Sequence, residues 1–163
     1  MKKILFFGGQ NSGKSRLAEE KTLGLCTKKP YYIATYLDEF DDEDMKKKIK
    51  QHQKSRAESF INVEEPYDIS KSIKEGNTYI IDCLSMLIFN NLEDENRLFS
   101  QLDSISTCKA NIVFVLNDVS GGIVASDKQS RKFVELSGRV GQKVASFCDE
   151  VFEVKFGLVK KWK

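Results

Sequence analysis

Residues 3–15 read Lys-Ile-Leu-Phe-Phe-Gly-Gly-Gln-Asn-Ser-Gly-Lys-Ser, and they carry the strongest indication of the fold. The apolar run at residues 3–7 is typical of a buried strand, and the glycines that follow end it in a tight loop. Residues 8–15 match the pattern G-x-x-x-x-G-K-[ST], directly after that strand and before a helix predicted for residues 16–25. The sequence therefore predicts a phosphate-binding loop, with a chance glycine turn as the alternative.

The residue types in this loop suit a nucleoside triphosphate. Glycines let backbone N–H groups turn toward phosphates, and the following helix adds the positive end of its dipole. Lys14 is expected to reach the β- and γ-phosphates, and the Ser15 hydroxyl is expected to bind Mg²⁺. The predicted nucleotide-binding residues of the loop are Gly8, Gly9, Gln10, Asn11, Ser12, Gly13, Lys14 and Ser15.

Asp82 is the second candidate metal ligand. It follows an apolar strand predicted for residues 78–81, and a carboxylate at the end of a core strand can hold Mg²⁺ directly or through water. We expect this strand to lie beside the strand at residues 3–7, so that Asp82 faces Ser15. The alternative is that Asp82 caps a helix that begins near Leu84.

Strands and helices alternate along the rest of the chain. Further strands are predicted at residues 31–35, 60–63, 111–116 and 150–154, with an edge strand at 158–162. Helices are predicted at residues 41–57, 68–74, 84–92, 93–105 and 128–147, and a long loop at 117–127. The pattern indicates the α/β class, a three-layer P-loop NTPase fold whose mostly parallel sheet has helices on both faces, in a single domain at residues 1–163.

Composition limits the function classes. A net charge of +2 gives no strong attraction to nucleic acid, and the lysines at residues 46–50 follow an acidic run, which favours a solvated helix face over a polyanion site. No apolar run approaches the ~20 residues of a membrane span, and the N-terminal run is too short for a secretion signal. The four cysteines form no C-x-x-C pair and there is one histidine, so a zinc site is not expected and reduced thiols fit the cytoplasm.

That one histidine, His52, lies in the helix predicted at residues 41–57. Met45, Ile49, His52 and Arg56 are spaced by four, three and four residues, so they share one helix face. Spacing alone leaves two interpretations open, a catalytic residue or a partner of the helix dipole.

Several segments in order resemble the bifunctional adenosylcobinamide kinase/adenosylcobinamide-phosphate guanylyltransferase family of cobalamin biosynthesis. The resemblance rests on the loop with Ala18-Glu19, on Tyr32-Ile33-Ala34-Thr35, on the Met45 to Arg56 block, and on Glu64-Glu65-Pro66, Asp82-Cys83-Leu84-Ser85, Asn90-Asn91-Leu92, Asn117-Asp118-Val119 and Arg131 to Arg139. It covers nearly the whole chain. Asp118, Ala125 and Gly141 stand where the family usually has Glu, Pro and Asn.

The resemblance implies an activity and further site residues. His52 matches the histidine that becomes guanylylated, and Ala34, Thr35, Arg56, Glu65 and Asp82 match positions that contact the nucleotide. It implies GTP and ATP as substrates with Mg²⁺, adenosylcobinamide and its phosphate as acceptors, and a homo-oligomer, with a trimer as the form expected.

Two other functions fit parts of the sequence. A small-molecule kinase or NTPase of the same architecture would use Lys14, Ser15 and Asp82 without transferring GMP. A nucleotide-binding regulatory protein would bind without turnover, although it has no need of both Lys14 and Asp82.

Overall fold

The computed structural model describes residues 1–36, 57–121 and 126–163. Its strands are β1 (Lys3–Gly8), β2 (Tyr31–Ala34), β3 (Ile61–Glu64), β4 (Thr78–Asp82), β5 (Asn111–Asn117), β6 (Glu150–Lys155) and β7 (Leu158–Lys161). Its helices are α1 (Lys14–Leu25), the 3₁₀-helix η1 (Ile69–Ser72), α3 (Leu84–Asn90), α4 (Glu95–Thr107) and α5 (Lys128–Phe147).

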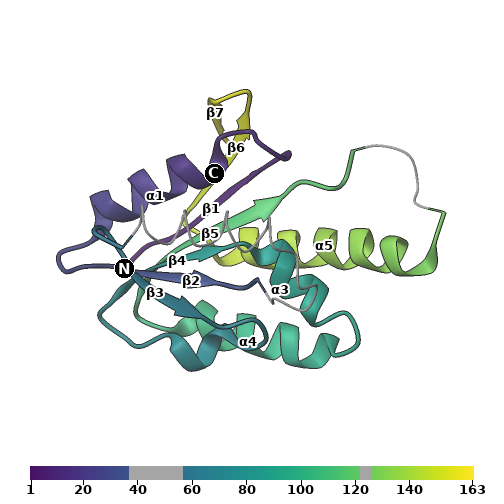
Figure 1. The fold of residues 1–163 in the computed structure, drawn as a ribbon, viewed down its shortest axis with the longest axis horizontal. Helices are drawn as coiled ribbons and strands as arrows, with labels where there is room; N and C mark the ends of the chain where they lie inside the picture. Colours follow the sequence, from purple (N-terminus) through teal and green to yellow (C-terminus); the bar gives the residue numbers. More distant parts are fainter. Residues whose placement is uncertain (37–56, 122–125) are drawn as a thin grey trace.

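All of these strands join one seven-stranded sheet in the order β3-β2-β4-β5-β1-β6-β7 (Figure 1). Every neighbouring pair is parallel except β6 and β7, which run antiparallel at one edge. The predicted α/β class, the mostly parallel sheet and the C-terminal edge strand are therefore confirmed.

The expected neighbourhood of β1 and β4 is wrong, because β5 lies between them. Gly8 at the end of β1 pairs in register with Asn117 of β5, and Asp82 of β4 pairs with Val115 of the same strand. Both β4 and β5 are apolar and buried on both faces, so their sequences do not specify which of them pairs with β1. Only packing of the whole sheet decides that order.

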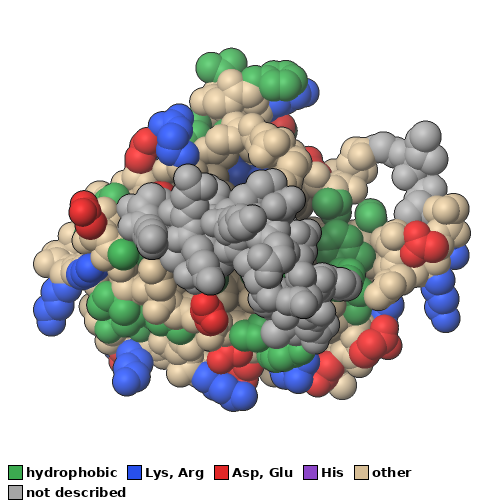
Figure 2. All heavy atoms as spheres, in the orientation of Figure 1, with side chains coloured by type: hydrophobic (Ala, Val, Ile, Leu, Met, Phe, Trp, Pro, Cys, Tyr) green, Lys and Arg blue, Asp and Glu red, His purple; other side chains and the backbone are tan. Residues whose placement is uncertain are grey.

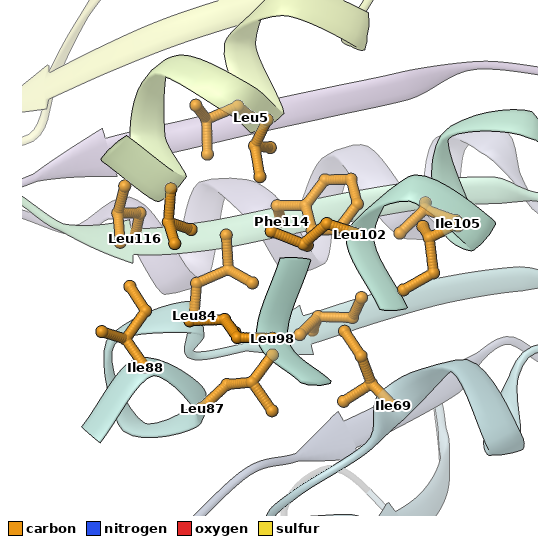
Figure 3. Packing of buried hydrophobic residues seen from close by; sticks show 14 of the residues in the cluster. Leu5, Ile69, Leu84, Leu87, Ile88, Leu98, Leu102, Ile105, Phe114 and Leu116 are labelled. Carbon is orange, nitrogen blue, oxygen red and sulfur yellow. The ribbon is translucent and has the colours of Figure 1, made fainter. Parts of the chain in front are cut away.

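Helices cover both faces of the sheet, in three layers. On one face, Ala18 of α1 packs against Ile4 and Phe6 of β1. On the other face, α3, α4 and α5 pack over Leu5 and Phe114, in the cluster drawn in Figure 3. The alternation of residues 4, 5 and 6 between the two clusters is the alternation of side chains along a strand.

Some predicted boundaries differ from the structure. Helix α1 begins at Lys14 rather than at residue 16. The two helices predicted at 84–92 and 93–105 are present as α3 and α4, but α3 ends at Asn90 and α4 runs from Glu95 to Thr107. Asn91, which is buried, is the C-cap of α3, and Asp94 caps α4 by accepting a hydrogen bond from the Arg97 N–H. Helix α5 has the predicted bounds, with Asp127 as its cap. The helix predicted at residues 41–57 lies, apart from Ala57, outside the described residues.

The helices, surface charges and cysteines of the described residues agree with the expectations from the composition. No helix there is both long and apolar enough to cross a membrane. Figure 2 shows Lys and Arg interspersed with Asp and Glu on the visible face. All four cysteines are free thiols, and burial raises the pKa of Cys148 to about 12.

Glu150, the first residue of β6, gathers lysines around a buried carboxylate. Its Oε1 accepts a hydrogen bond from Lys2 Nζ at 2.7 Å, and its Oε2 accepts one from Lys21 Nζ at 3.0 Å. The hydrogen bond from Lys2 and then that from Lys21 lower the pKa of Glu150 from 4.5 to about 2. This carboxylate thereby ties the N-terminus and α1 to the start of β6.

We predict that Glu150→Gln lowers the free energy of unfolding by about 1 kcal/mol at pH 7, a modest loss because the lysines are solvated. The folded-state pKa is depressed, so the stabilisation is present above pH 4.5 and is lost as the pH falls toward 2. Urea denaturation from pH 7 to pH 3 measures it, with Glu20→Gln in the exposed Arg16–Glu20 pair as the control. A Glu150→Gln deficit that does not change with pH would contradict the assignment.

Candidate phosphate-binding site

Two glycines give the loop after β1 its shape. A Cβ on Gly8 would lie 2.2 Å from the carbonyl oxygen of Val154 in β6, so no side chain fits at this position. Gly13 has a φ of 93° and precedes α1, a conformation that L-residues rarely adopt. The loop therefore folds tightly over the end of β1 and leads directly into the N-terminus of α1.

The loop is held from both sides by backbone hydrogen bonds. The Asp118 N–H donates to the Gly8 carbonyl at 2.8 Å, and the Gly157 N–H, in the turn between β6 and β7, donates to the Ser12 carbonyl at 2.9 Å. The Ser12 hydroxyl is buried and has no hydrogen-bond partner in the described part of the chain. A loop fixed in this way keeps its remaining N–H groups positioned for an anion.

Lys14 is buried at the base of the loop, with 6% of its surface exposed. Its Nζ donates to the Gly9 carbonyl at 3.1 Å. Burial lowers the pKa of Lys14, and the nearby negative charge of Asp82 opposes this shift. Burial removes water from around Nζ and so disfavours its charged form. A negatively charged phosphate oxygen beside Nζ would favour that charged form again.

A cavity of about 470 Å³ joins the loop to the end of β4. Among the described residues, those that line it are Gln10, Asn11, Ser12, Gly13, Lys14, Ser15, Arg16, Asp82, Cys83 and Asn117. Asp82 thus faces the same cavity as Lys14 and Ser15, although β5 separates the two strands. Gly8 and Gly9 shape the loop from outside this lining.

Asp82 is oriented by a side chain from β2. The Tyr32 hydroxyl donates to Asp82 Oδ2 at 2.5 Å. The cap of α3 is Cys83, with no side-chain hydrogen bond, so Asp82 is not the cap of that helix. The alternative that Asp82 is a helix cap is therefore wrong. The Tyr32 hydroxyl binds Oδ2 of Asp82, so Oδ1 is the carboxylate oxygen that Tyr32 leaves for a metal ion.

Ala34, Thr35 and Glu65 lie at the ends of β2 and β3 and do not line the cavity. The Thr35 hydroxyl donates to the Cys83 carbonyl at 2.6 Å, and Glu65 Oε1 accepts from the Asp68 N–H at 3.0 Å. The first bond joins the ends of β2 and β4, and the second lies within the turn that follows β3. Nucleotide contacts at the three residues remain predictions, and so do those at His52 and Arg56, which lie outside the described residues.

Tyr32 and Asn117 are the functional candidates that reasoning from the sequence missed. Asn117 ends β5, and Tyr32 is buried in β2 beside Phe60. Each belongs to a segment with a recognisable pattern, but no local signal shows that its side chain reaches Asp82 or the loop. A polar residue that ends a predicted core strand was the one available signal for Asn117.

Comparison with known proteins connects this geometry to a family. The family model for cobinamide kinase / cobinamide phosphate guanyltransferase matches residues 4–161. The chain is 30% identical to the bifunctional adenosylcobalamin biosynthesis protein CobP of Pseudomonas aeruginosa, over 94% of this chain and 93% of that protein. It is 29% identical to the bifunctional adenosylcobalamin biosynthesis protein CobU of Escherichia coli, over 98% and 99%.

Solved structures share the fold at low sequence identity. The flagellar accessory protein FlaH from Methanocaldococcus jannaschii aligns with a TM-score of 0.53 and 13% identity, over 99% of this chain and 78% of that one. A protein from Pyrococcus horikoshii aligns with a TM-score of 0.55 and 11% identity, over 99% and 86%. This likeness supports the P-loop NTPase fold.

We predict that Lys14→Ala weakens binding of GTP and ATP by about ten- to a hundredfold, because a charge-assisted contact to phosphate is worth roughly 1.5–3 kcal/mol. Isothermal titration calorimetry measures the affinity. Lys21→Ala is the matched control, since this lysine lies on the same helix but bonds Glu150. Unchanged affinity of Lys14→Ala for both nucleotides would exclude the loop as their binding site.

Proposed function

The chain belongs to the cobinamide kinase / cobinamide phosphate guanyltransferase family, and from this premise we propose that it phosphorylates adenosylcobinamide and then transfers GMP to the product. The proposal rests on one structural observation. Lys14, Ser15 and Asp82 face one cavity at the carboxyl edge of the sheet, in a chain that matches the family over nearly its whole length.

In the kinase step, the loop holds the triphosphate of ATP or GTP. Backbone N–H groups of residues 10–15 and the N-terminus of α1 bind the phosphates, and Lys14 neutralises charge on the β- and γ-phosphates. A hydroxyl oxygen of adenosylcobinamide attacks the γ-phosphorus, the bond from that phosphorus to the β–γ bridging oxygen breaks, and the hydroxyl proton passes to solvent. The nucleoside diphosphate leaves.

In the guanylyltransferase step, His52 is the nucleophile. A neutral imidazole nitrogen attacks the α-phosphorus of GTP, the bond to the α–β bridging oxygen breaks, and pyrophosphate leaves. A phosphate oxygen of adenosylcobinamide phosphate then attacks the same phosphorus, and the phosphorus–nitrogen bond breaks to regenerate His52. Lys14 and Arg56 neutralise charge on the phosphates during both transfers.

The residues present fit a magnesium ion at the same cavity. Ser15 offers a hydroxyl and Asp82 a carboxylate oxygen, and both are the hard oxygen donors that Mg²⁺ prefers. Mg²⁺ in nucleotide-dependent enzymes is typically bound by one or two carboxylates together with substrate phosphates, and Asp82 beside a bound triphosphate would supply such a set. When bound, the ion would neutralise charge on the phosphates.

The remaining proposals follow from the family alone. We propose a cytoplasmic homo-oligomer, and a trimer is the expected form. Sedimentation equilibrium at micromolar concentration measures the subunit count.

We predict that α-labelled GTP with Mg²⁺ leaves label on the denatured protein, because GMP becomes covalently bound to His52. A histidine-bound label can only be on His52, since it is the only histidine in the chain. The bond should be labile to acid and stable to base, since protonation of the phosphoramidate nitrogen makes imidazole a good leaving group. γ-Labelled GTP should leave none, because that phosphate departs in pyrophosphate. Arg56→Ala should slow labelling without abolishing it.

The matched variant is His52→Asn, which should lose all label and retain GTP binding. Tight GTP binding by the wild type without any label would favour a P-loop kinase or NTPase over a guanylyltransferase. Label that persists in His52→Asn would exclude His52 as the nucleophile.

We predict that Tyr32→Phe raises the Mg²⁺ concentration for half-maximal labelling by about tenfold, because groups that orient a metal ligand typically contribute that much affinity. Asp82→Asn should raise it further, and neither should change GTP binding in EDTA. Tyr31→Phe is the matched control, since this neighbour packs on the opposite face of the sheet against Tyr79. An equal shift in Tyr31→Phe and Tyr32→Phe would show a general structural effect instead.

A further inference from the structure

A second cavity, of about 350 Å³, lies between α5 and the sheet. Leu5 and Phe7 of β1 and Leu116 of β5 form part of its floor, and Val134 of α5 lies on its wall. The lining is almost entirely apolar, and the volume is in the range of small-molecule sites. It lies on the face of the sheet opposite to α1.

This cavity adjoins the phosphate-binding cavity at one residue. Asn117 lines both of them. It can do so because β5 lies between β1 and β4, which places the end of β5 between the loop and Asp82. The Asn117 N–H donates to Ser85 Oγ at 3.0 Å, and this bond fixes the end of the strand. A molecule in the apolar cavity is therefore beside the phosphates of a nucleotide in the loop.

Small residues keep the wall formed by α5 open. A Cβ on Gly138 would meet no atom within 4 Å, and one on Gly141 would reach Leu116 Cδ2 at 3.4 Å. Each glycine costs a helix interior about 1 kcal/mol relative to alanine. Ser137, next to Gly138 on α5, also lines the cavity. It is 5% exposed, and its hydroxyl has no hydrogen-bond partner in the described part of the chain.

An unpaired buried hydroxyl costs free energy, and a ligand toward which the Ser137 side chain rotates can recover it by pairing with that hydroxyl. The cavity thus offers apolar walls and the Ser137 side chain, with Asn117 at its boundary with the phosphate-binding cavity. These features suit a molecule that carries methyl and amide groups and that must place one hydroxyl or phosphate beside a nucleotide.

We propose that this cavity is the acceptor subsite and takes one methyl- and amide-bearing edge of the corrinoid, an inference that rests on the proposed function. The cavity is too small for the whole macrocycle, so the remainder lies outside it. Asn117 then contacts both the acceptor and the transferred phosphoryl group. The nucleotide at the carboxyl edge of the sheet and the acceptor on the α5 face then meet at the end of β5.

The test is a pair of substitutions at one position. Gly138→Leu extends a side chain over the cavity, and Gly138→Ala is the matched control, since both residues are favourable in a helix. Equilibrium dialysis of adenosylcobinamide, measured by the visible absorption of the corrin, gives the affinity. We expect Gly138→Leu to weaken binding about tenfold or more, roughly 1.4 kcal/mol, with Gly138→Ala near the wild type. Neither should change GTP affinity or His52 labelling.

Trp162 gives a second readout, because it is the only tryptophan in the chain and it lines this cavity. Corrinoid should quench its fluorescence in the wild type and in Gly138→Ala at lower concentration than in Gly138→Leu. Ser137→Ala should weaken corrinoid binding severalfold without lowering the melting temperature, since it removes a hydroxyl that has no partner in the described protein.

The outcomes separate the two proposals. Equal corrinoid affinity of Gly138→Leu and Gly138→Ala, in a protein that still forms the His52 label, would overturn the subsite alone. Corrinoid binding that is lost only in Gly138→Leu, without any His52 label, would support the subsite and contradict guanylyl transfer. A wild type that binds no corrinoid would overturn the subsite.

Discussion

The pairing of β1 between β5 and β6 sets the position of the phosphate-binding loop and of the elements around it. Parallel hydrogen bonds on both sides fix where β1 ends, and β6 approaches so closely that only glycine fits at residue 8. The loop that follows is then held by Asp118 on one side and Gly157 on the other. The phosphate-binding geometry is therefore a property of three strands and their connections, and not of the loop motif alone.

The order of the strands also determines how the residues of the site lie relative to one another. Because β5 separates β1 from β4, Asp82 faces the loop across the width of one strand, and the residue at the end of that strand lies between them. Tyr32 reaches Asp82 from β2 through a hydrogen bond from its hydroxyl. The buried cluster under α3, α4 and α5 supplies the rigid support that keeps these strand ends in place.

Charged groups at the two edges of the sheet have different functions. At the amino end of β6, the lysines around Glu150 satisfy a buried carboxylate and stabilise the fold. At the carboxyl edge, burial lowers the pKa of Lys14, and its Nζ donates a hydrogen bond to the Gly9 carbonyl. Asp82 is the carboxylate that acts on Lys14, whereas two lysines surround Glu150. The first arrangement is complete within the protein, whereas the second suits an anionic ligand.

The amino-acid sequence alone was enough to predict the loop at residues 8–15, the α/β class and the family, and it indicated Asp82 as a candidate metal ligand. Glycine spacing, apolar periodicity and a polar residue at a strand end are all local patterns. The sequence did not predict that β5 lies between β1 and β4, because the sequence of a strand that is buried on both faces does not specify which strands pair with it. For the same reason it gave no sign that Tyr32 orients Asp82 or that Asn117 joins two cavities. Those contacts connect residues 50 and more than 100 positions apart, and only the tertiary structure brings them together.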